Sequence, residues 1–311
     1  MLSGVGESAH LQQVGITPVH HLPGVGRNLR DHPYVHMVYE CKQPELCFSV
    51  GDWTGTGTDT DTNTLALALA RRVRRDWDSH KGGMGASNLM EAVLFARTSP
   101  EVAHPNIEVQ QLPLRFALRE GDGAQLLLPG ITAIPTLVRP RSVGSLRLQS
   151  NNPGDPPLID PNVFAVPADL DDMLSALHLV RTVFSQAALH DMVGEELTPG
   201  ASVSSREGLI AFLRAHASLL FHPVGTCRMG DGDASRVGVA EHGKSASAEL
   251  AQMQTHAQEH EFVLDTRLRV RGIAALRVVD ASVFPSLPSG NTLAPTLMVA
   301  ERAAEFILED A

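Results

Sequence analysis

Hydrophobic residues recur with two different spacings along the chain, and these spacings predict strands in its middle and helices after them. Short apolar and β-branched runs predict strands over residues 89–97, 107–114, 131–138 and 145–148. Over residues 169–184 the apolar positions follow helical spacing, which predicts a helix with Asp169 as its N-cap. Strands followed by helices favour an antiparallel sheet covered by helices on one face, an α+β fold.

Further elements are expected near both ends of the chain. Residues 8–15 form a short predicted helix ended by a glycine, and Ser205 opens another helix. Residues 276–280 have the pattern of a short buried strand that ends in the carboxylate of Asp280. A terminal helix is expected from residue 292 or 295 to residue 308, with one apolar face made of Leu297, Ala300, Ala304, Ile307 and Leu308.

The composition is typical of a soluble globular protein and argues against two classes of partner. The chain has 311 residues, of which 43% are hydrophobic and 19% charged, and no apolar run is long enough to cross a bilayer. The net charge of −10 argues against nucleic-acid binding, because phosphate contacts need clustered lysine and arginine. The three cysteines form neither a disulfide framework nor a zinc pattern, so a reducing compartment such as the cytoplasm is the default expectation.

Two polar stretches interrupt these elements. Residues 54–64 alternate threonine with glycine, aspartate and asparagine, which predicts a mobile loop, and residues 231–262 read as a polar insertion. The insertion contains an H-x-x-E-H motif, His256, Glu259 and His260, in which two histidines one helical turn apart could bind zinc. Because so short a motif arises easily by chance among 14 histidines, a zinc peptidase-like protein is kept only as an alternative.

Four histidines also lie close together near the start of the chain. His20, His21, His32 and His36 lack a regular ligand spacing, and no cluster of cysteines or carboxylates accompanies them. We interpret them as polar surface and expect no metal site there.

His222 stands in a setting that suits a proton acceptor. Its unperturbed pKa is nearest neutrality of all side chains, and the following Pro223 restricts the backbone on both sides of the peptide bond. A rigidly held imidazole can take the proton from a substrate hydroxyl. The same residues also fit a buried histidine at a helix-to-loop junction, and taken alone they favour that plainer interpretation.

Several motifs together change this balance. The segment 221–230, which contains His222, resembles the histidine motif of the glucose-methanol-choline (GMC) family of flavin-dependent alcohol oxidoreductases, and especially of its choline dehydrogenase-like and alcohol dehydrogenase members. Further segments resemble motifs of the same family, in the family's order: residues 1–6, 22–33, 140–148, 277–285 and 288–296.

The resemblance implies roles for particular residues. It makes the protein an oxidoreductase that binds flavin adenine dinucleotide (FAD) and acts on the CH–OH group of an alcohol. His222 becomes the catalytic base and Asn291 the second active-site residue, which hydrogen-bonds the substrate oxygen. Four positions are implied in cofactor binding: Asp280, the amide of Ala281, Asn291 and Thr292. From the residues alone, Asp280 also fits a turn or cap and Asn291 a turn after glycine.

The resemblance covers only the later half or so of a family member. Residues 4–9 fit G-x-G-x-x-A, but no strand precedes them, so they are not a dinucleotide fingerprint. We therefore expect the N-terminal Rossmann-like portion of an α/β FAD-binding domain to be absent. The expected division is residues 1–40 as a trailing part of that domain, 41–215 as a substrate-binding domain and 216–311 as a catalytic, FAD-contacting segment.

Three explanations fit an absent cofactor half. The chain is a fragment, one subunit of a split enzyme, or a non-catalytic binding module; because the motif residues needed for chemistry are intact, we favour a fragment. In the first two cases a partner half would complete the FAD site. Surface that packs on such a half would otherwise be open, so we expect an exposed apolar patch near His222 and Asp280.

Overall fold

The computed structural model describes most of the chain, in ranges separated by gaps. The described residues are 1–43, 47, 71, 73–79, 81–82, 86–118, 125–231 and 262–310. Three expectations lie outside these ranges: the loop at 54–64, the interior of the polar insertion at 231–262, and the H-x-x-E-H motif within it.

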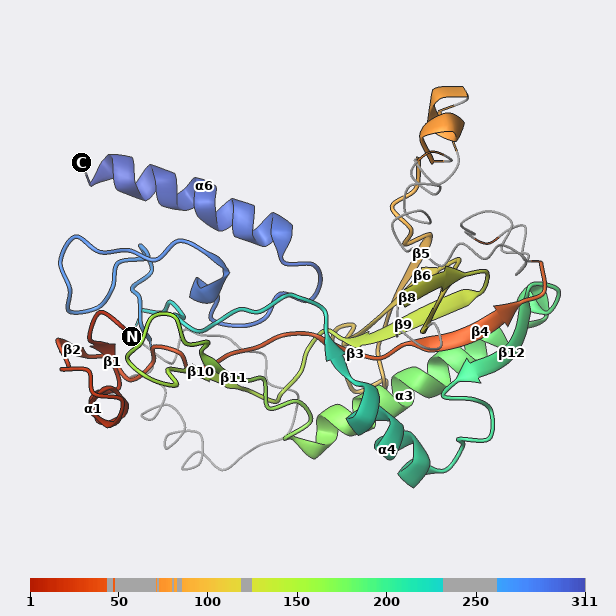
Figure 1. Cartoon of the computed structure of the whole chain (residues 1–311), viewed down its shortest axis with the longest axis horizontal. Helices are drawn as coiled ribbons and strands as arrows, with labels where there is room; N and C mark the ends of the chain where they lie inside the picture. The colour runs from red at the N-terminus through yellow and green to blue at the C-terminus, as the bar shows by residue number, and fades with distance from the viewer. Residues whose placement is uncertain are drawn as a thin grey trace.

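Seven strands form an antiparallel sheet around a central strand, β9, Ile131–Leu137 (Figure 1). β6 pairs with one side of β9, while β3 and β4 pair one after the other with its opposite side. β5 extends the sheet beyond β6, β12 beyond β4 and β13 beyond β3. The bounds of these strands are β3 Pro33–Tyr34, β4 Met37–Cys41, β5 Ala92–Ala96, β6 Ile107–Leu112, β12 Val193–Thr198 and β13 Ser218–Leu219. The predicted α+β fold with an antiparallel sheet is confirmed.

The main core lies between this sheet and two helices, α3 (Pro167–Phe184) and α4 (Arg206–His216). Because successive residues of a strand point to opposite faces, only alternate positions reach the helices. The strand residues of the core are apolar: Val35, Met37, Tyr39, Ile107, Val109, Ile131, Ala133 and Leu137. They pack against the buried apolar face of α3, which includes Met173 and Leu177. The opposite face of the sheet carries buried polar residues, among them Glu108 and Thr136.

A second, smaller core joins the start of the chain to its last quarter. Here Leu22 packs with residues that follow His222 in the sequence, among them Val224, Leu264, Val283, Phe284 and Val299. In Figure 1 this part lies beside the sheet and carries both chain ends. Its elements are β1 (Val5–Gly6), α1 (Ser8–Gln13), β2 (His20–His21), a 3₁₀ turn (Ala281–Val283) and α6 (Leu293–Glu309).

Short hairpins and turns add further elements. β7 (Arg115–Leu118) pairs with β8 (Gln125–Leu128), and β10 (Ser145–Arg147) pairs with β11 (Leu158–Asp160). A 3₁₀ turn over Ala187–Leu189 follows α3. No described helix is both long enough and apolar enough to span a membrane.

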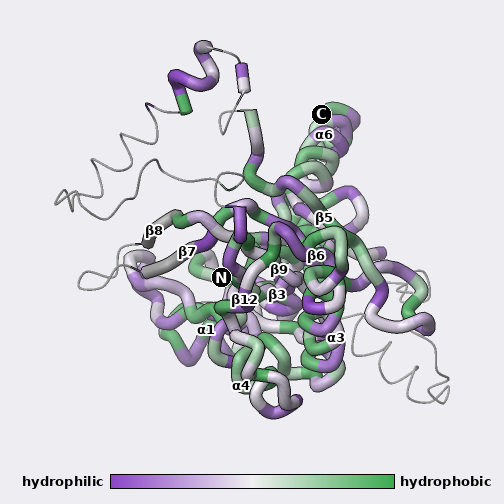
Figure 2. The backbone as a smooth tube through the Cα atoms, turned by 90° about the vertical axis from the view of Figure 1, so that its right-hand side faces the viewer, coloured by the Kyte–Doolittle hydropathy of each residue, from purple (hydrophilic) through white to green (hydrophobic). Residues whose placement is uncertain are grey.

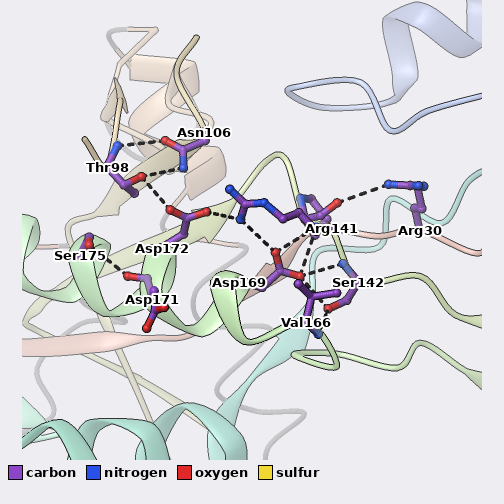
Figure 3. A network of polar contacts seen from close by, with 11 residues as sticks. Arg30, Thr98, Asn106, Arg141, Ser142, Val166, Asp169, Asp171, Asp172 and Ser175 are labelled. Atoms are coloured by element: carbon purple, nitrogen blue, oxygen red, sulfur yellow. Dashed lines mark hydrogen bonds and ion pairs between the residues drawn. The ribbon is translucent and has the colours of Figure 1, made fainter. Parts of the chain in front are cut away.

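The predicted role of Asp169 as an N-cap is wrong. Helix α3 begins two residues earlier, at Pro167, and its N-cap is Val166. Proline suits the first helical turn, since it lacks the N–H that would have no partner there. The carboxylate of Asp169 does not cap the helix but accepts hydrogen bonds from Arg141 and Ser142, which lie in another segment (Figure 3). The N-cap predicted at Ser205 is confirmed, because its hydroxyl accepts from the amide of Gly208.

One expectation about an apolar segment is also wrong. Residues 276–280 form only an isolated bridge, Arg269 with Arg277, and the side chains of Leu276 and Val279 are exposed. The terminal helix α6 exists as predicted, but its buried residues are Val299 and Ala303. Leu297, Ile307 and Leu308, which were predicted to share one apolar face of this helix, are exposed. Figure 2 shows hydrophobic and hydrophilic residues mixed along α6, at the outside of the molecule.

Candidate active site

Strand pairing brings His222 to the segment Asp31–His32, far away in the sequence. β13 pairs with β3, with Leu219 opposite Pro33, and the amide of Leu220 donates to the carbonyl of His32 at 3.0 Å. Just beyond the histidine, Val224 and Arg30 exchange two backbone hydrogen bonds of 2.9 and 3.1 Å. The backbone on both sides of His222 is therefore held against one short segment of the chain.

The carboxylate of Asp31 joins the two histidines directly. Its Oδ1 accepts from the backbone N–H of His32 at 2.7 Å and from the backbone N–H of His222 at 3.0 Å. Burial raises the pKa of Asp31, although the two N–H donors act in the opposite direction. One side chain thus fixes the relative position of two segments separated by 190 residues.

The glycine of the histidine motif is required by a close approach of two backbones. Gly225 has φ of +91°, and a Cβ there would lie 2.4 Å from the carbonyl oxygen of Asn28. Asn28 in turn donates from Nδ2 to the carbonyl of Gly225 at 3.3 Å. Only glycine meets both conditions, the positive φ and the absent side chain.

A chain of hydrogen bonds fixes which nitrogen of His222 is free to accept a proton. His32 Nε2 lies 2.9 Å from the carbonyl oxygen of Pro288, which can only accept, so His32 carries its proton on Nε2. Neutral His32 then has its lone pair on Nδ1, which lies 2.9 Å from His222 Nδ1. His222 must therefore donate from Nδ1, and its lone pair is on Nε2.

The pKa values of both histidines favour this neutral arrangement. Burial, followed by the charge on His222, lowers the pKa of His32 to about 4. Burial also lowers the pKa of His222, against the opposing carboxylates of Asp31 and Glu108. At neutral pH both rings are uncharged, and His222 Nε2 can accept a proton.

Asn291 lies at the free nitrogen of His222. Its Nδ2 is 3.4 Å from His222 Nε2, the distance of a weak hydrogen bond in which the amide donates. Asn291 precedes α6 and is exposed. The two predicted catalytic residues, 69 positions apart, are therefore brought together, with a donor and a proton acceptor side by side.

The predicted cofactor residues lie in two turns next to this pair. Asp280 Oδ1 accepts from the amide of Ser282 at 2.8 Å and so caps the turn that begins at Ala281. The histidine motif is attached to the same turn, because Cys227 N–H donates to the carbonyl of Ser282 at 2.9 Å. Thr292 is the N-cap residue of α6 but makes no side-chain cap. Their role in cofactor binding stays a prediction.

Two residues of this site were missed as candidates. His32 was interpreted as polar surface, but it is fully buried and hydrogen-bonded through both ring nitrogens. Asp31 was quoted only as part of a motif. The sequence signal was their position, directly before Pro33 in the resembling segment 22–33. Among the residues that the structure describes, no group of three or more His, Cys, Asp or Glu could hold a metal ion.

Several apolar residues beside the site are exposed, as an apolar patch there requires. Phe221, next to His222, is 86% exposed and has φ of +59°, which is rare for a bulky residue. Val279, next to Asp280, is exposed, as are three residues of the first turns of α6, Leu293, Leu297 and Met298. Large apolar side chains gathered at a surface are typical of binding surfaces.

Comparison with known protein families identifies the chain. The family model described as GMC oxidoreductase matches residues 140–246 and 251–300. The chain belongs to the GMC oxidoreductase family. The resemblance seen in the sequence motifs is thereby confirmed, and the matched residues include His222 and Asn291.

Individual GMC relatives match along nearly the whole chain. An oxygen-dependent choline dehydrogenase of Vibrio vulnificus (strain YJ016) is 34% identical over 307 residues, which are 99% of this chain and 48% of that protein. The mitochondrial choline dehydrogenase of Homo sapiens is 34% identical over 99% of this chain and 45% of its own length. The chain spans about half the length of the curated relatives it matches.

Solved structures share the fold. A formate oxidase variant from Aspergillus oryzae RIB40 has a TM-score of 0.75 at 23% identity, covering 99% of this chain and 51% of that one. An FAD-dependent oxidoreductase from Chaetomium thermophilum has a TM-score of 0.70 at 21% identity, covering 99% and 52%. The arrangement of the sheet and the terminal segment is therefore that of about half of a GMC structure.

We predict that folding stability falls as the pH drops from 6.5 towards 4. Unfolded His32 binds a proton with the ordinary pKa of 6.5, whereas folded His32 binds one only near pH 4. Between these values the unfolded chain holds more protons, so acid favours unfolding, by about 3 kcal/mol at most. Urea unfolding at several pH values measures this slope. It should be shallower in His32→Gln, and an unchanged slope in that variant would contradict the assignment.

Proposed function

We propose that this chain forms the catalytic part of an FAD-dependent oxidoreductase that oxidises the CH–OH group of an alcohol. The observation that carries the proposal is the hydrogen-bonded series from the Pro288 carbonyl through His32 to His222, which leaves Nε2 as a proton acceptor beside the Asn291 amide. A base and an oxygen-binding donor at one point are what removal of a hydroxyl proton requires.

In the proposed reaction, the substrate oxygen lies within hydrogen-bonding distance of both His222 Nε2 and Asn291 Nδ2. Neutral His222 takes the hydroxyl proton at Nε2, while Asn291 donates to the oxygen as negative charge develops on it. Asparagine suits this role because its amide donates without titrating. The positive charge formed on His222 is stabilised by the nearby carboxylate of Asp31, and His32 keeps the ring in one orientation.

The described residues fit a flavin beside this pair. The first turn of α6 has no side-chain cap, so its amides and the positive end of the helix are open towards a negatively charged group. A Cβ added at Gly290 would meet no atom within 4 Å, so space is available there. Asp280, the amide of Ala281, Asn291 and Thr292 are the residues that would hold the cofactor. When bound, FAD would supply the hydride acceptor.

A dinucleotide-binding half must complete the FAD site in this proposal. We assign residues 1–40 to the trailing part of that domain, 41–215 to substrate binding and 216–311 to catalysis and flavin contact. The exposed apolar residues beside His222, Asp280 and α6 are the surface on which such a half would pack. The half would belong to the same polypeptide or to a separate subunit; a non-catalytic binding module is the second candidate.

The visible absorption spectrum after incubation with FAD, recorded together with a metal analysis, is the first test. A flavin band that survives desalting means that this chain holds the cofactor alone, and alcohols can then be screened directly. A colourless protein requires the complementary half to be added before the screen. Failure of any alcohol to reduce flavin in the loaded protein would reject the enzymatic proposal in favour of the binding module. Stoichiometric zinc would instead favour His256, Glu259 and His260.

A further inference from the structure

The face of the sheet opposite the main core carries a row of polar residues that leads to the active site. Strand register places Glu108 of β6 opposite Phe95 of β5 on one side and Thr136 of β9 on the other. The row continues to Tyr34 of β3 and Ser218 of β13, four residues before His222. Residues opposite one another in a ladder share a face, so Glu108 belongs to the same surface as the strand that delivers His222.

Glu108 and its neighbour Gln110 are buried but incompletely bonded. They are 3% and 5% exposed, and Gln110 Nε2 donates to Glu108 Oε1 at 2.7 Å. This bond fixes the orientation of the amide, because only its nitrogen can donate to a carboxylate. Gln110 Oε1 is then buried with no hydrogen-bond partner.

The Glu108 carboxylate also lacks a counterion in the part of the chain that the structure describes. Its one hydrogen bond comes from the neutral amide of Gln110, and no lysine, arginine or histidine forms an ion pair with it. Two arrangements are unfavourable in the free protein: a buried carboxylate without a counterion, and a buried carbonyl oxygen without a hydrogen-bond donor. Such groups are retained where a ligand supplies what is missing.

We propose that Glu108 and Gln110 form a recognition subsite for a protonated amine carried by the alcohol substrate. The inference rests on the proposed function of His222. An ammonium group with N–H hydrogens supplies the positive charge that Glu108 lacks and the donor that Gln110 Oε1 lacks. A quaternary ammonium supplies only the charge, and a neutral alkyl group supplies neither.

Two neighbours of the subsite agree with this assignment. Phe95, opposite Glu108 in the ladder, is half exposed, so an aromatic ring lies beside the carboxylate where a cation would be held. The Glu108 charge also reaches the catalytic centre: burial lowers the pKa of His222, and Asp31 and Glu108 both oppose that effect. A ligand anchored at Glu108 therefore lies within electrostatic range of the proton acceptor.

The test is a binding measurement that needs neither FAD nor turnover. Isothermal calorimetry on the full chain compares 2-aminoethanol, choline and 1-propanol as probes, which differ in N–H hydrogens and charge. We expect 2-aminoethanol to bind about tenfold or more tightly than either of the others. Equal affinity for 2-aminoethanol and choline would overturn the proposal, as would the absence of saturable amine binding, which would leave an ordered water as the partner of Gln110.

Two variants divide the effect between the groups, and a third serves as a control. Glu108→Gln should lower the affinity for both 2-aminoethanol and choline, whereas Gln110→Met should lower the affinity for 2-aminoethanol only. Glu40 is an exposed glutamate on β4 of the same sheet, and Glu40→Gln should leave both affinities unchanged. Unaltered amine affinity in Glu108→Gln would refute the subsite.

Further measurements distinguish the amine subsite from an effect on folding and from the proposed reaction. Because Glu108→Gln removes a buried unpaired charge, its thermal midpoint should be unchanged or raised, whereas a structural carboxylate would show a drop. Binding of the amine without alcohol oxidation would uphold the subsite and reject the reaction. Oxidation of neutral alcohols without amine binding would do the reverse.

Discussion

Replacing His222 by alanine lowers the rate of alcohol oxidation by about 10²- to 10⁴-fold in the FAD-loaded protein, the range expected for loss of a positioned general base. The effect is large because no other described group can take over. His32 lies on the far side of the ring, and burial lowers its pKa to about 4, so it is a weak base. The Asn291 amide has no lone pair on the nitrogen that faces the site. The measurement is the rate of flavin reduction by alcohol in rapid mixing.

The pH profile separates loss of the base from loss of structure. In the unaltered protein the rate should fall as the pH drops through the pKa of His222, which burial keeps below its ordinary value of 6.5. His222→Ala should lose this dependence while flavin absorbance stays the same, and added imidazole should restore part of the rate. Asn291→Ala is the matched control, since it should slow the reaction but keep the acid limb. Flavin reduction at the unaltered rate in His222→Ala would remove His222 from the role of base.

The sheet could be predicted from the sequence because its periodicity is local. Ile107, Val109, Ile131 and Ala133 alternate with polar residues or stand in β-branched runs, and both strands formed where expected. The helix at 293–309 was likewise found from its 3.6-residue spacing. The direction in which the apolar residues of this helix point could not be predicted, because Leu297 and Leu308 are apolar whether they face this chain or another surface. Periodicity shows that a face is apolar but not what covers it.

The site was only half predictable for a related reason. His222 and Asn291 belong to motifs that carry their own signal, so they could be named before the structure. Asp31 and His32 act through contacts with His222 across 190 residues, and a histidine before a proline has many ordinary uses. Likewise, Asp169 has the composition and position of a helix cap, and only the tertiary structure shows that its carboxylate binds another segment.

That carboxylate connects the helices of the core to the active-site segment. Asp169 accepts from the backbone N–H of Arg141 at 2.9 Å and from that of Ser142 at 2.8 Å (Figure 3). The Ser142 hydroxyl donates to Asp169 at 2.6 Å and accepts from Val166 N–H at 3.0 Å. Pro140 directly precedes Arg141, and its carbonyl accepts a hydrogen bond from the side chain of Arg30. Arg30 in turn directly precedes Asp31. The path thus runs from the start of α3 to the residues that position His222.

Asp169→Ala should therefore destabilise the folded chain by about 3–5 kcal/mol, measured as the change in the free energy of urea unfolding. Its side chain is 1% exposed, so its removal leaves the Arg141 guanidinium with one carboxylate, that of Asp172, and two backbone amides without an acceptor. Asp171→Ala, two residues later in the same helix, is the matched control. Its carboxylate is 57% exposed and pairs with exposed Arg206, a contact worth less than about 1 kcal/mol. Because charge and helix propensity change equally in both variants, the difference between them isolates the buried network. Equal losses would mean that the network contributes nothing beyond an ordinary surface pair, and that Asp31 and His32 are positioned without it.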